Sequence, residues 1–546
     1  MDLNGISDSI DPPDRPDTVL GQLGPVGRDS FNRLLRWLLQ RTGAELRVDY
    51  RIAPSLTTRS ECELLGLSAP RFAIRSHVSA PAQGGERIPA FFNLRRLEWI
   101  KAAIDQTHDQ KLTDLNEHAV VAEALLGECS PRIHGFSRLT CDLGHAYGED
   151  GTVTTGTPFM QHVDVVGGGM CAQACLQMAI CLQQEHAKQI PSVAEITALA
   201  ELAAPAKNGI LPGTMKLRGL DAWQISDVLR RQELELYGVI ESYGMTGNRV
   251  RPVPANGLPN LGYVLATYLA SHVPVIALVR LPRLAEPGSI YETNSIRPVL
   301  TSQESSIGHA VLLVGYRSHK GHDEFLINDP ATYPFLRATS DQLLACRTGD
   351  SQLQLDLQFI PVLPEPVRLT LVGRTPRPRP QETSPKERDP IGLLWLAKAL
   401  QKSPVTRDPP LPPIPKTLPP IPKTWSWPGE FHLVDFHCQD LERTLGHYVF
   451  SGCQDSDRKT LAKQLLHEIK QDATHQGTRW KWVQTIGPVQ ISGPGEVGHV
   501  WIWNAEHVLK DYRAQENRPA VEAVYDRGAG CLRRFKTPTP ATGPRP

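Results

Sequence analysis

The sequence predicts an α+β protein whose central domain has a cysteine-bearing helix followed by an antiparallel sheet. A helix and further helical segments are expected from residue 171 onward. After them come four strand-like segments rich in Val, Ile and Leu, with the sequences PVIALVRLP, GHAVLLVGY, EFLINDP and LQLDLQFIPV. Because the helices come first and the strands later, the order favours the α+β class.

The chain has 546 residues, which is too long for one hydrophobic core, and its composition is 40% hydrophobic and 21% charged, as in ordinary globular proteins. Shifts in composition divide it into an N-terminal α/β domain, a central domain, a Pro-rich basic linker, a small C-terminal α/β domain and a disordered tail. The expected boundaries are 1–155, 156–365, 366–425, 426–535 and 536–546.

The flanking domains show weaker secondary-structure patterns. In the N-terminal domain, apolar spacing predicts helices over 31–38, 94–104 and 115–126, with a strand at ELRVDYRIA. In the C-terminal domain a helix is expected near 459–471, followed by strands at RWKWVQTI and HVWIWN. Neither domain contains a recognisable chemical motif.

Charge and targeting signals point to a cytoplasmic protein. Lys plus Arg and Asp plus Glu are both 58, so no overall field favours a nucleic acid or an anionic membrane. The N-terminus is acidic and Pro-rich, unlike a signal peptide, and no apolar run reaches the roughly 20 residues that span a bilayer. The 10 cysteines are too sparse for a disulfide scaffold. No cofactor or metal is expected.

The linker is rich in proline and contains the heptapeptide LPPIPKT twice in tandem, at 411–417 and 418–424. Basic residues outnumber acidic ones there. This composition is typical of a semi-rigid polyproline spacer, and its PxxP character leaves open a protein partner that binds the linker.

The most informative stretch is QHVDVVGGGMCAQACLQMAIC, from Gln161 to Cys181. Three glycines precede Cys171, and the apolar helix begins at this cysteine. The unpaired amides and the positive dipole end of a helix N-terminus favour a thiolate, which is the reactive form of cysteine. Glycines before it allow a substrate backbone to approach the sulfur. Cys171 is therefore a candidate nucleophile.

A nucleophilic thiolate needs an imidazole that can exchange its proton. His309 lies 138 positions after Cys171, at the start of the strand GHAVLLVGY. Asn328 and Asp329 end the next strand, and a hairpin at SHKGHDE would bring that end beside His309. Adjacent strand residues point to opposite faces, so only one of the two can orient the imidazole.

These segments resemble the papain-like cysteine peptidases, specifically the bacteriocin-processing, double-glycine leader peptidases and their soluble relatives. In the papain group the His follows the Cys by about 130 to 150 residues. CAQACLQM resembles the family's nucleophile helix, SHVPVIALV and GHAVLLVGY its strands before and at the His, and INDPA and PFLRATSDQLLAC its Asp-Pro turn and the segment after it.

The resemblance implies that Cys171 attacks a carbonyl, that His309 transfers the proton, that Asp329 orients His309, and that Gln161 stabilises the oxyanion. There are differences from the family. Met170 and Ala172 stand where the family usually has Asp and Gly, and Gln161 lies further before the cysteine than the family's glutamine. The family's transporter domains have no counterpart here, so the resemblance implies a stand-alone peptidase acting on a peptide or protein.

Other interpretations remain open. The same acyl-enzyme could pass to an amine or thiol, which would make the protein a transferase. Alternatively the domain is a non-catalytic scaffold that binds peptides, with Cys171 as a buried small side chain, as lone cysteines usually are. A redox pair of Cys171 with Cys175, and a zinc site formed by His432, His437, Cys438 and Cys453, match their expected patterns poorly. His467 and Glu468 are not followed by the second His of a zincin motif.

Overall fold

The fold is described from a computed structural model of the chain. The described residues are 47–54, 72–81, 87–96, 119–126, 133–142, 155–161, 170–183, 191, 193–203, 219–230, 234, 236–243, 261–296, 308–319, 322–347, 357–364, 371–372, 431–450, 455–471, 479–486, 499–504, 509–510, 521–526 and 531–534. They fall into two compact units. The first unit lies within Met1–Gly244 and Val273–Val362, and the second within Met245–His272 and Leu363–Pro546.

The N-terminal part of the first unit forms a six-stranded sheet in the order β1-β2-β3-β4-β7-β6, with antiparallel pairing throughout. Its strands are β1 Arg47–Pro54, β2 Phe72–Pro81, β3 Arg87–Arg96, β4 Ala119–Leu126, β6 Cys141–Asp142 and β7 Thr155–Phe159.

The helix expected at 115–126 is wrong over 119–126, and the helix expected at 94–104 is wrong over 94–96, while 97–104 lies outside the described residues. Leu94 lies in strand β3, and the end of the expected helix at 115–126 is strand β4. Both stretches are apolar enough to suit either periodicity, and β4 pairs with strands on both sides, so sheet pairing decided their structure. The strand predicted at ELRVDYRIA is confirmed as β1. The expected helix at 31–38 lies outside the described residues.

The second sheet of the first unit contains all four strands predicted for the central domain. Its order is β13-β12-β11-β10-β14-β8, with β5 paired to β11 and β9 paired to β14. Neighbouring strands from β13 to β14 are antiparallel, as expected. The strands are β5 Ser137–Arg138, β8 Leu236–Gly238, β9 Glu241–Tyr243, β10 Val275–Arg280, β11 Gly308–His319, β12 His322–Asn328, β13 Leu336–Thr339 and β14 Leu357–Pro364.

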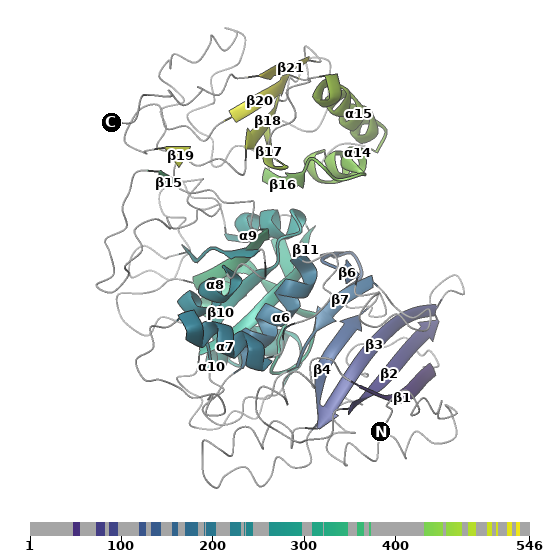
Figure 1. Cartoon of the computed structure of the whole chain (residues 1–546), viewed down its shortest axis with the longest axis vertical. Coiled ribbons are helices and arrows are strands. Elements are labelled where there is room, and N and C mark those ends of the chain that lie inside the picture. Colours follow the sequence, from purple (N-terminus) through teal and green to yellow (C-terminus); the bar gives the residue numbers. More distant parts are fainter. Residues whose placement is uncertain are drawn as a thin grey trace. The chain divides into compact units, whose positions relative to one another are not determined.

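Helix α6, Cys171–Gln183, packs against this sheet and contacts β10 and β11 (Figure 1). Its residues from Cys171 to Cys181 are all buried, as expected of a helix without a polar face. The two buried glutamines find partners on the neighbouring segment: Gln173 Nε2 donates to Thr197 Oγ1, and Gln177 Nε2 donates to the Pro191 carbonyl. The helix is thus fixed in position along its length.

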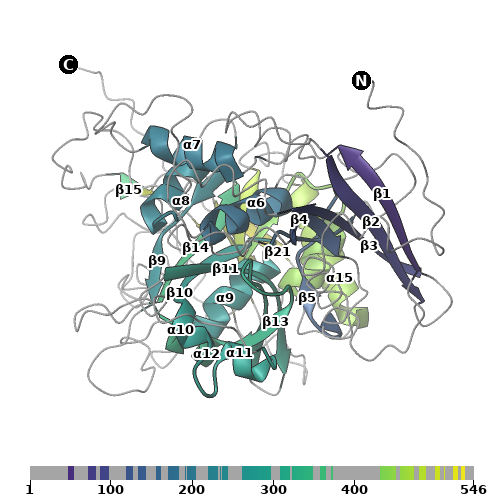
Figure 2. The same ribbon diagram turned by 90° about the horizontal axis from the view of Figure 1, so that it is seen from below.

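Short helices complete the first unit. Figure 2 shows α10, α11 and α12 grouped near β10 and β13, and α11 and α12 both contact β13. Helices α8 and α12 each begin with a capping box, at Asp221 and Gln224 and at Thr339 and Gln342. The helices are α7 Val193–Ala203, α8 Ala222–Leu229, α10 Leu281–Leu284, α11 Ile290–Thr293 and α12 Ser340–Ala345.

Gly315 in β11 is required by close packing. The register between β11 and β12 shifts between Leu313 and Gly315, and β5 pairs with β11 at this point. A Cβ atom on Gly315 would lie 2.7 Å from the Ser137 carbonyl oxygen, closer than side chains tolerate. Glycine therefore allows β5 to approach the strand that contains His309.

The second unit contains a five-stranded antiparallel sheet in the order β16-β17-β18-β20-β21 and a two-stranded pair, β15 with β19. The expected helix and both expected strands are confirmed as α15, β17 and β18, but antiparallel pairing makes the unit α+β rather than α/β. Its elements are α9 Leu261–Ala270, β15 Leu371–Val372, β16 Phe431–Asp435, α14 Leu441–Thr444, the π-helix η6 Leu445–Val449, α15 Asp455–Gln471, β17 Trp480–Ile486, β18 His499–Asn504, β19 Leu509–Lys510, β20 Val521–Asp526 and β21 Cys531–Arg534.

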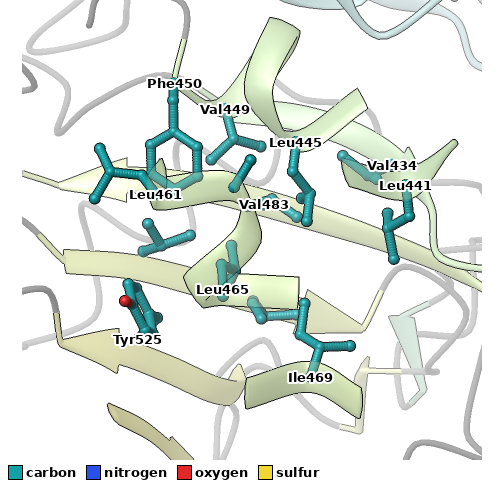
Figure 3. Packing of buried hydrophobic residues seen from close by; sticks show 13 residues of the cluster. Val434, Leu441, Leu445, Val449, Phe450, Leu461, Leu465, Ile469, Val483 and Tyr525 are labelled. Carbon is teal, nitrogen blue, oxygen red and sulfur yellow. The ribbon is translucent and has the colours of Figure 1, made fainter. Parts of the chain in front are cut away.

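The core of the second unit lies between its helices and one face of this sheet (Figure 3). Leu461, Leu465 and Ile469 of α15 lie at helical spacing and pack on Val483 and Tyr525. The other face of the sheet meets α9, where Tyr268 makes an edge-to-face contact with Trp482 and Ser271 Oγ accepts the Leu433 amide.

The division into units differs from the expected boundaries. Residues before 155 belong with the central domain, because β4 pairs with β7 and β5 pairs with β11. Helix α9, expected in the central domain, belongs to the second unit. Apart from β15, the Pro-rich linker lies outside the described residues, as does the tail at 536–546. No helix in the described ranges is long and apolar enough to cross a membrane.

Candidate active site

Cys171 is the first residue of α6. The helix begins here because the Met170 carbonyl accepts the first helical hydrogen bond, from the Ala174 amide. The Cys171 side chain is buried with the residue only 6% exposed, and its Sγ accepts a hydrogen bond of 3.3 Å from the Ala310 amide of β11. A backbone donor and a helix N-terminus both direct positive potential at the sulfur, which stabilises negative charge on it.

His309 precedes Ala310 in β11, so the strand that donates to the sulfur also contains the imidazole. Its Nε2 lies 2.7 Å from Asp329 Oδ1, and both side chains are fully buried. The other ring nitrogen, Nδ1, is buried and makes no hydrogen bond of normal geometry. With Nε2 held by the carboxylate, Nδ1 is the nitrogen left to exchange a proton with Cys171.

Asp329 directly follows β12 and is surrounded by hydrogen-bond donors. Oδ1 accepts from His309 and, at 2.9 Å, from the Ala331 amide. Oδ2 accepts from the Tyr291 hydroxyl at 2.6 Å and from the Thr332 hydroxyl at 2.9 Å. Four donors satisfy a carboxylate that has no exposure to solvent.

Electrostatic interactions hold His309 and Asp329 in their charged forms. Burial alone would lower the pKa of His309, but the Asp329 carboxylate and the Cys171 side chain outweigh it and raise that pKa well above its usual value. Burial would raise the pKa of Asp329, yet His309 and the donors Tyr291 and Ala331 lower it. The site therefore favours an imidazolium at His309 beside an ionised Asp329 carboxylate.

The Asn328 side chain is directed away from His309 and Asp329, as the alternation of side chains along a strand requires. Its amide nitrogen donates to the Pro158 carbonyl at 2.8 Å, and its Oδ1 accepts the Phe335 amide at 3.1 Å. Of the two residues at the end of β12, the structure brings only Asp329 to His309. Asn328 instead connects β12 to the segment at Pro158 and to the start of β13.

Gln161 lies just after β7, and its Nε2 donates to the Thr332 carbonyl at 3.3 Å. It thus reaches the turn that surrounds Asp329. The glycine-rich stretch at 162–169, between Gln161 and the cysteine helix, lies outside the described residues.

The neighbouring thiols are in different environments from Cys171. Cys175, one turn further along α6, is completely buried, and burial together with the charges of Cys171 and Asp329 raises its pKa well above the usual value. Burial also raises the pKa of Cys346 to about 12. Both thiols stay protonated and unreactive at neutral pH. No group of three His, Cys, Asp or Glu side chains that could hold a metal ion occurs in the described parts of the chain, and Cys453 of the weakly matching zinc pattern lies outside them.

Three of the four expected site residues, Cys171, His309 and Asp329, come together. Sequence reasoning missed Tyr291 and the Ala310 amide. Tyr291 lies 38 residues before Asp329, on a helix of four residues, and no sequence periodicity marks it. Ala310 follows His309 directly, and its role could have been found only from the register that sets β11 against α6.

A nucleophile whose charge is stabilised by backbone amides, beside a buried imidazolium, can attack a carbonyl and return a proton to the leaving group. This arrangement of residues is suited to acyl transfer.

No family model matches the chain, and no curated protein matches it as a relative.

Proposed function

We propose that the first unit is a papain-like cysteine peptidase or related amidohydrolase, which cleaves a peptide or isopeptide bond. One observation supports this most strongly: Cys171, His309 and Asp329, far apart in the sequence, converge with the thiol at a helix N-terminus and the imidazole between thiol and carboxylate. Nothing in ordinary packing requires three ionisable side chains to be buried together, because burial without partners is costly.

In this proposal the Cys171 thiolate attacks the substrate carbonyl, and the C=O electron pair moves onto oxygen. The Cys171 amide stabilises this oxyanion, with Gln161 as the second donor on the grounds of family resemblance. His309 then gives its Nδ1 proton to the leaving amine, and the C–N bond breaks to leave a thioester. Water attacks the thioester with His309 as the base, which releases the acid and restores the thiolate.

The test is alkylation of all 10 cysteines by iodoacetamide across pH, followed by mass spectrometry. Cys171 is expected to react fastest, because thiolates and not thiols react, and the Ala310 amide and the helix N-terminus stabilise negative charge on its sulfur. Cys175 and Cys346 should label last because burial raises their pKa values. If Cys171 labels no faster than Cys438, whose pKa is also raised, the nucleophile assignment is wrong.

A matched pair of variants separates chemistry from packing. Cys171→Ala should abolish processing of any substrate and Cys175→Ala should retain it, although both remove a buried sulfur from α6. Product masses with and without an added amine distinguish a hydrolase from a transferase, since only a transferase forms solely the amine adduct. Full cellular function of Cys171→Ala would favour the peptide-binding scaffold instead.

A further inference from the structure

A fourth side chain, Tyr291, lies deep in the first unit and contacts the proposed catalytic group through Asp329. Its residue is 1% exposed, and its hydroxyl donates to Asp329 Oδ2 at 2.6 Å. This is the carboxylate oxygen opposite the one that holds His309. A donor on Oδ2 turns Oδ1 toward the imidazole and stabilises the carboxylate in its ionised form.

The short helix α11 that contains Tyr291 is fixed at both ends. At its start, Ser289 Oγ donates to the Leu284 carbonyl at 2.5 Å. At its end, Asn294 exchanges two hydrogen bonds with the backbone of Arg337 in β13, of 2.8 and 2.9 Å. Gln342 of α12 adds a third anchor by donating to Thr293 Oγ1 at 2.7 Å. A helix of four residues cannot hold its own shape, so these anchors determine where the Tyr291 hydroxyl lies.

Hydrogen bonds at three residues, Ser289, Asn294 and Gln342, thus hold one hydroxyl on a buried carboxylate. We propose that Tyr291 is a positioning residue of the active site, which keeps Asp329 ionised and aligned so that His309 remains protonated beside Cys171. This inference rests on the proposed function. The titratable groups that act on Asp329 are His309 of β11, Tyr291 of α11 and Cys175 of α6, and Cys171 acts on the other side of His309.

Tyr291→Phe removes only the hydroxyl and keeps the buried ring. Without this donor the Asp329 carboxylate is less stable as an anion, so the pH at which Cys171 becomes reactive should rise. A hydrogen bond to a charged group corresponds to an acid-limb shift of about one pH unit. The measurement is the pH profile of Cys171 alkylation by iodoacetamide in the full chain, with folding checked by circular dichroism.

Two variants provide the comparison. Tyr237→Phe changes another buried tyrosine of the same unit, one that packs against Arg230, and should leave the profile unchanged. Thr332→Val removes the second donor to Oδ2 at a partly exposed position, where water can replace the hydroxyl, so its shift should be in the same direction but smaller. If Tyr291→Phe does not fold, Thr293→Val is the test: it removes the hydroxyl that anchors α11 to Gln342, keeps Tyr291, and should shift the profile in the same direction, whereas an unchanged profile would overturn the role.

The outcomes separate this inference from the proposed function. If wild-type Cys171 is no more reactive than the other thiols, the proposed function fails. If wild-type Cys171 is reactive and Asp329→Asn alters its profile, but Tyr291→Phe leaves it as in the wild type, the positioning role is overturned. An equal shift in Tyr237→Phe would also overturn it, because the effect would then come from general packing.

Discussion

The two units of the chain both pack a helix against an antiparallel sheet, but they bury opposite kinds of side chain there. In the second unit, α15 meets the sheet through aliphatic and aromatic residues such as Leu465 and Val483 (Figure 3). In the first unit, the N-terminus of α6 meets the sheet at a thiol, an imidazole and a carboxylate, which belong to Cys171, to His309 of β11 and to Asp329 just after β12.

The comparison separates aliphatic packing, which stabilises a fold, from the buried polar contacts on which the proposed chemistry depends. Aliphatic burial stabilises in proportion to the area removed from water, and it requires no alignment of donors. The Asp329 environment requires four donors in place, and a buried ion pair contributes little net stability even when complete. A polar interface of this kind is explained by function better than by folding.

The largest expected effect comes from Asp329→Asn. Loss of the carboxylate charge removes what outweighs the burial of His309, so the imidazole loses its proton and no longer pairs with the Cys171 thiolate. Alkylation of Cys171 near neutral pH should slow by about 100-fold, the lower end of what a positioned proton-transfer group contributes.

The matched control for this change is Asn328→Asp at the adjacent position. Asn328 bonds Pro158 and Phe335 and has no contact with His309, so its variant should lower stability without reproducing the altered Cys171 reactivity. Equal reactivity of Asp329→Asn and the wild type would show that the carboxylate has only a structural role.

A second prediction tests the aliphatic interface. Leu465→Ala leaves a cavity in the core of the second unit and should lower its free energy of unfolding by about 2–5 kcal/mol. The Cys171 alkylation rate should not change, since no residue of the proposed site lies in that unit. Hydrogen exchange in peptides from α15 and β17 measures the first effect, and alkylation measures the second.

Loss of Cys171 reactivity in Leu465→Ala under conditions where hydrogen exchange shows the first unit intact would contradict this separation. Lys463→Ala, on the exposed face of the same helix, is the control that should change neither quantity.

More of the candidate active site than of the N- and C-terminal domains could be predicted from the sequence. Cys171 and His309 adjoin strongly apolar segments whose helix and strand character is unambiguous, so their place in the fold followed directly. Strand alternation predicted that only one of Asn328 and Asp329 could face His309, the family resemblance favoured Asp329, and the hydrogen bonds show that Asp329 does so. Tyr291 was not predictable, because its approach to Asp329 depends on how α11 is anchored to β13 and α12.

Long-range contacts also explain why helix was predicted in the N-terminal region where the structure has strands. Leu94 and its neighbours fit a helical pattern, but β2 and β4 pair on either side of β3, and such long-range pairing cannot be seen in a local window. Local spacing therefore served well where one apolar segment dominates, and it failed where apolar residues are interspersed with charges, as around Arg95 and Arg96.

The smallest expected effect is a difference in how pH acts on the two units. The folded-state pKa of His309 is raised, so its contribution to stability is fully present below the unfolded value of about 6.5 and is lost as pH rises through the folded value. The pKa of Asp329 is lowered, so its contribution to stability is present above about 3.9 and is lost as pH falls through the folded value.

Urea denaturation followed by hydrogen exchange in β11 should show both of these losses of stability. The Asp329→Asn protein should show neither of them, and exchange in α15 should lack them in both proteins because its core contacts are aliphatic. Identical pH dependence of β11 in wild type and Asp329→Asn would mean that the buried pair does not govern the first unit's response to pH.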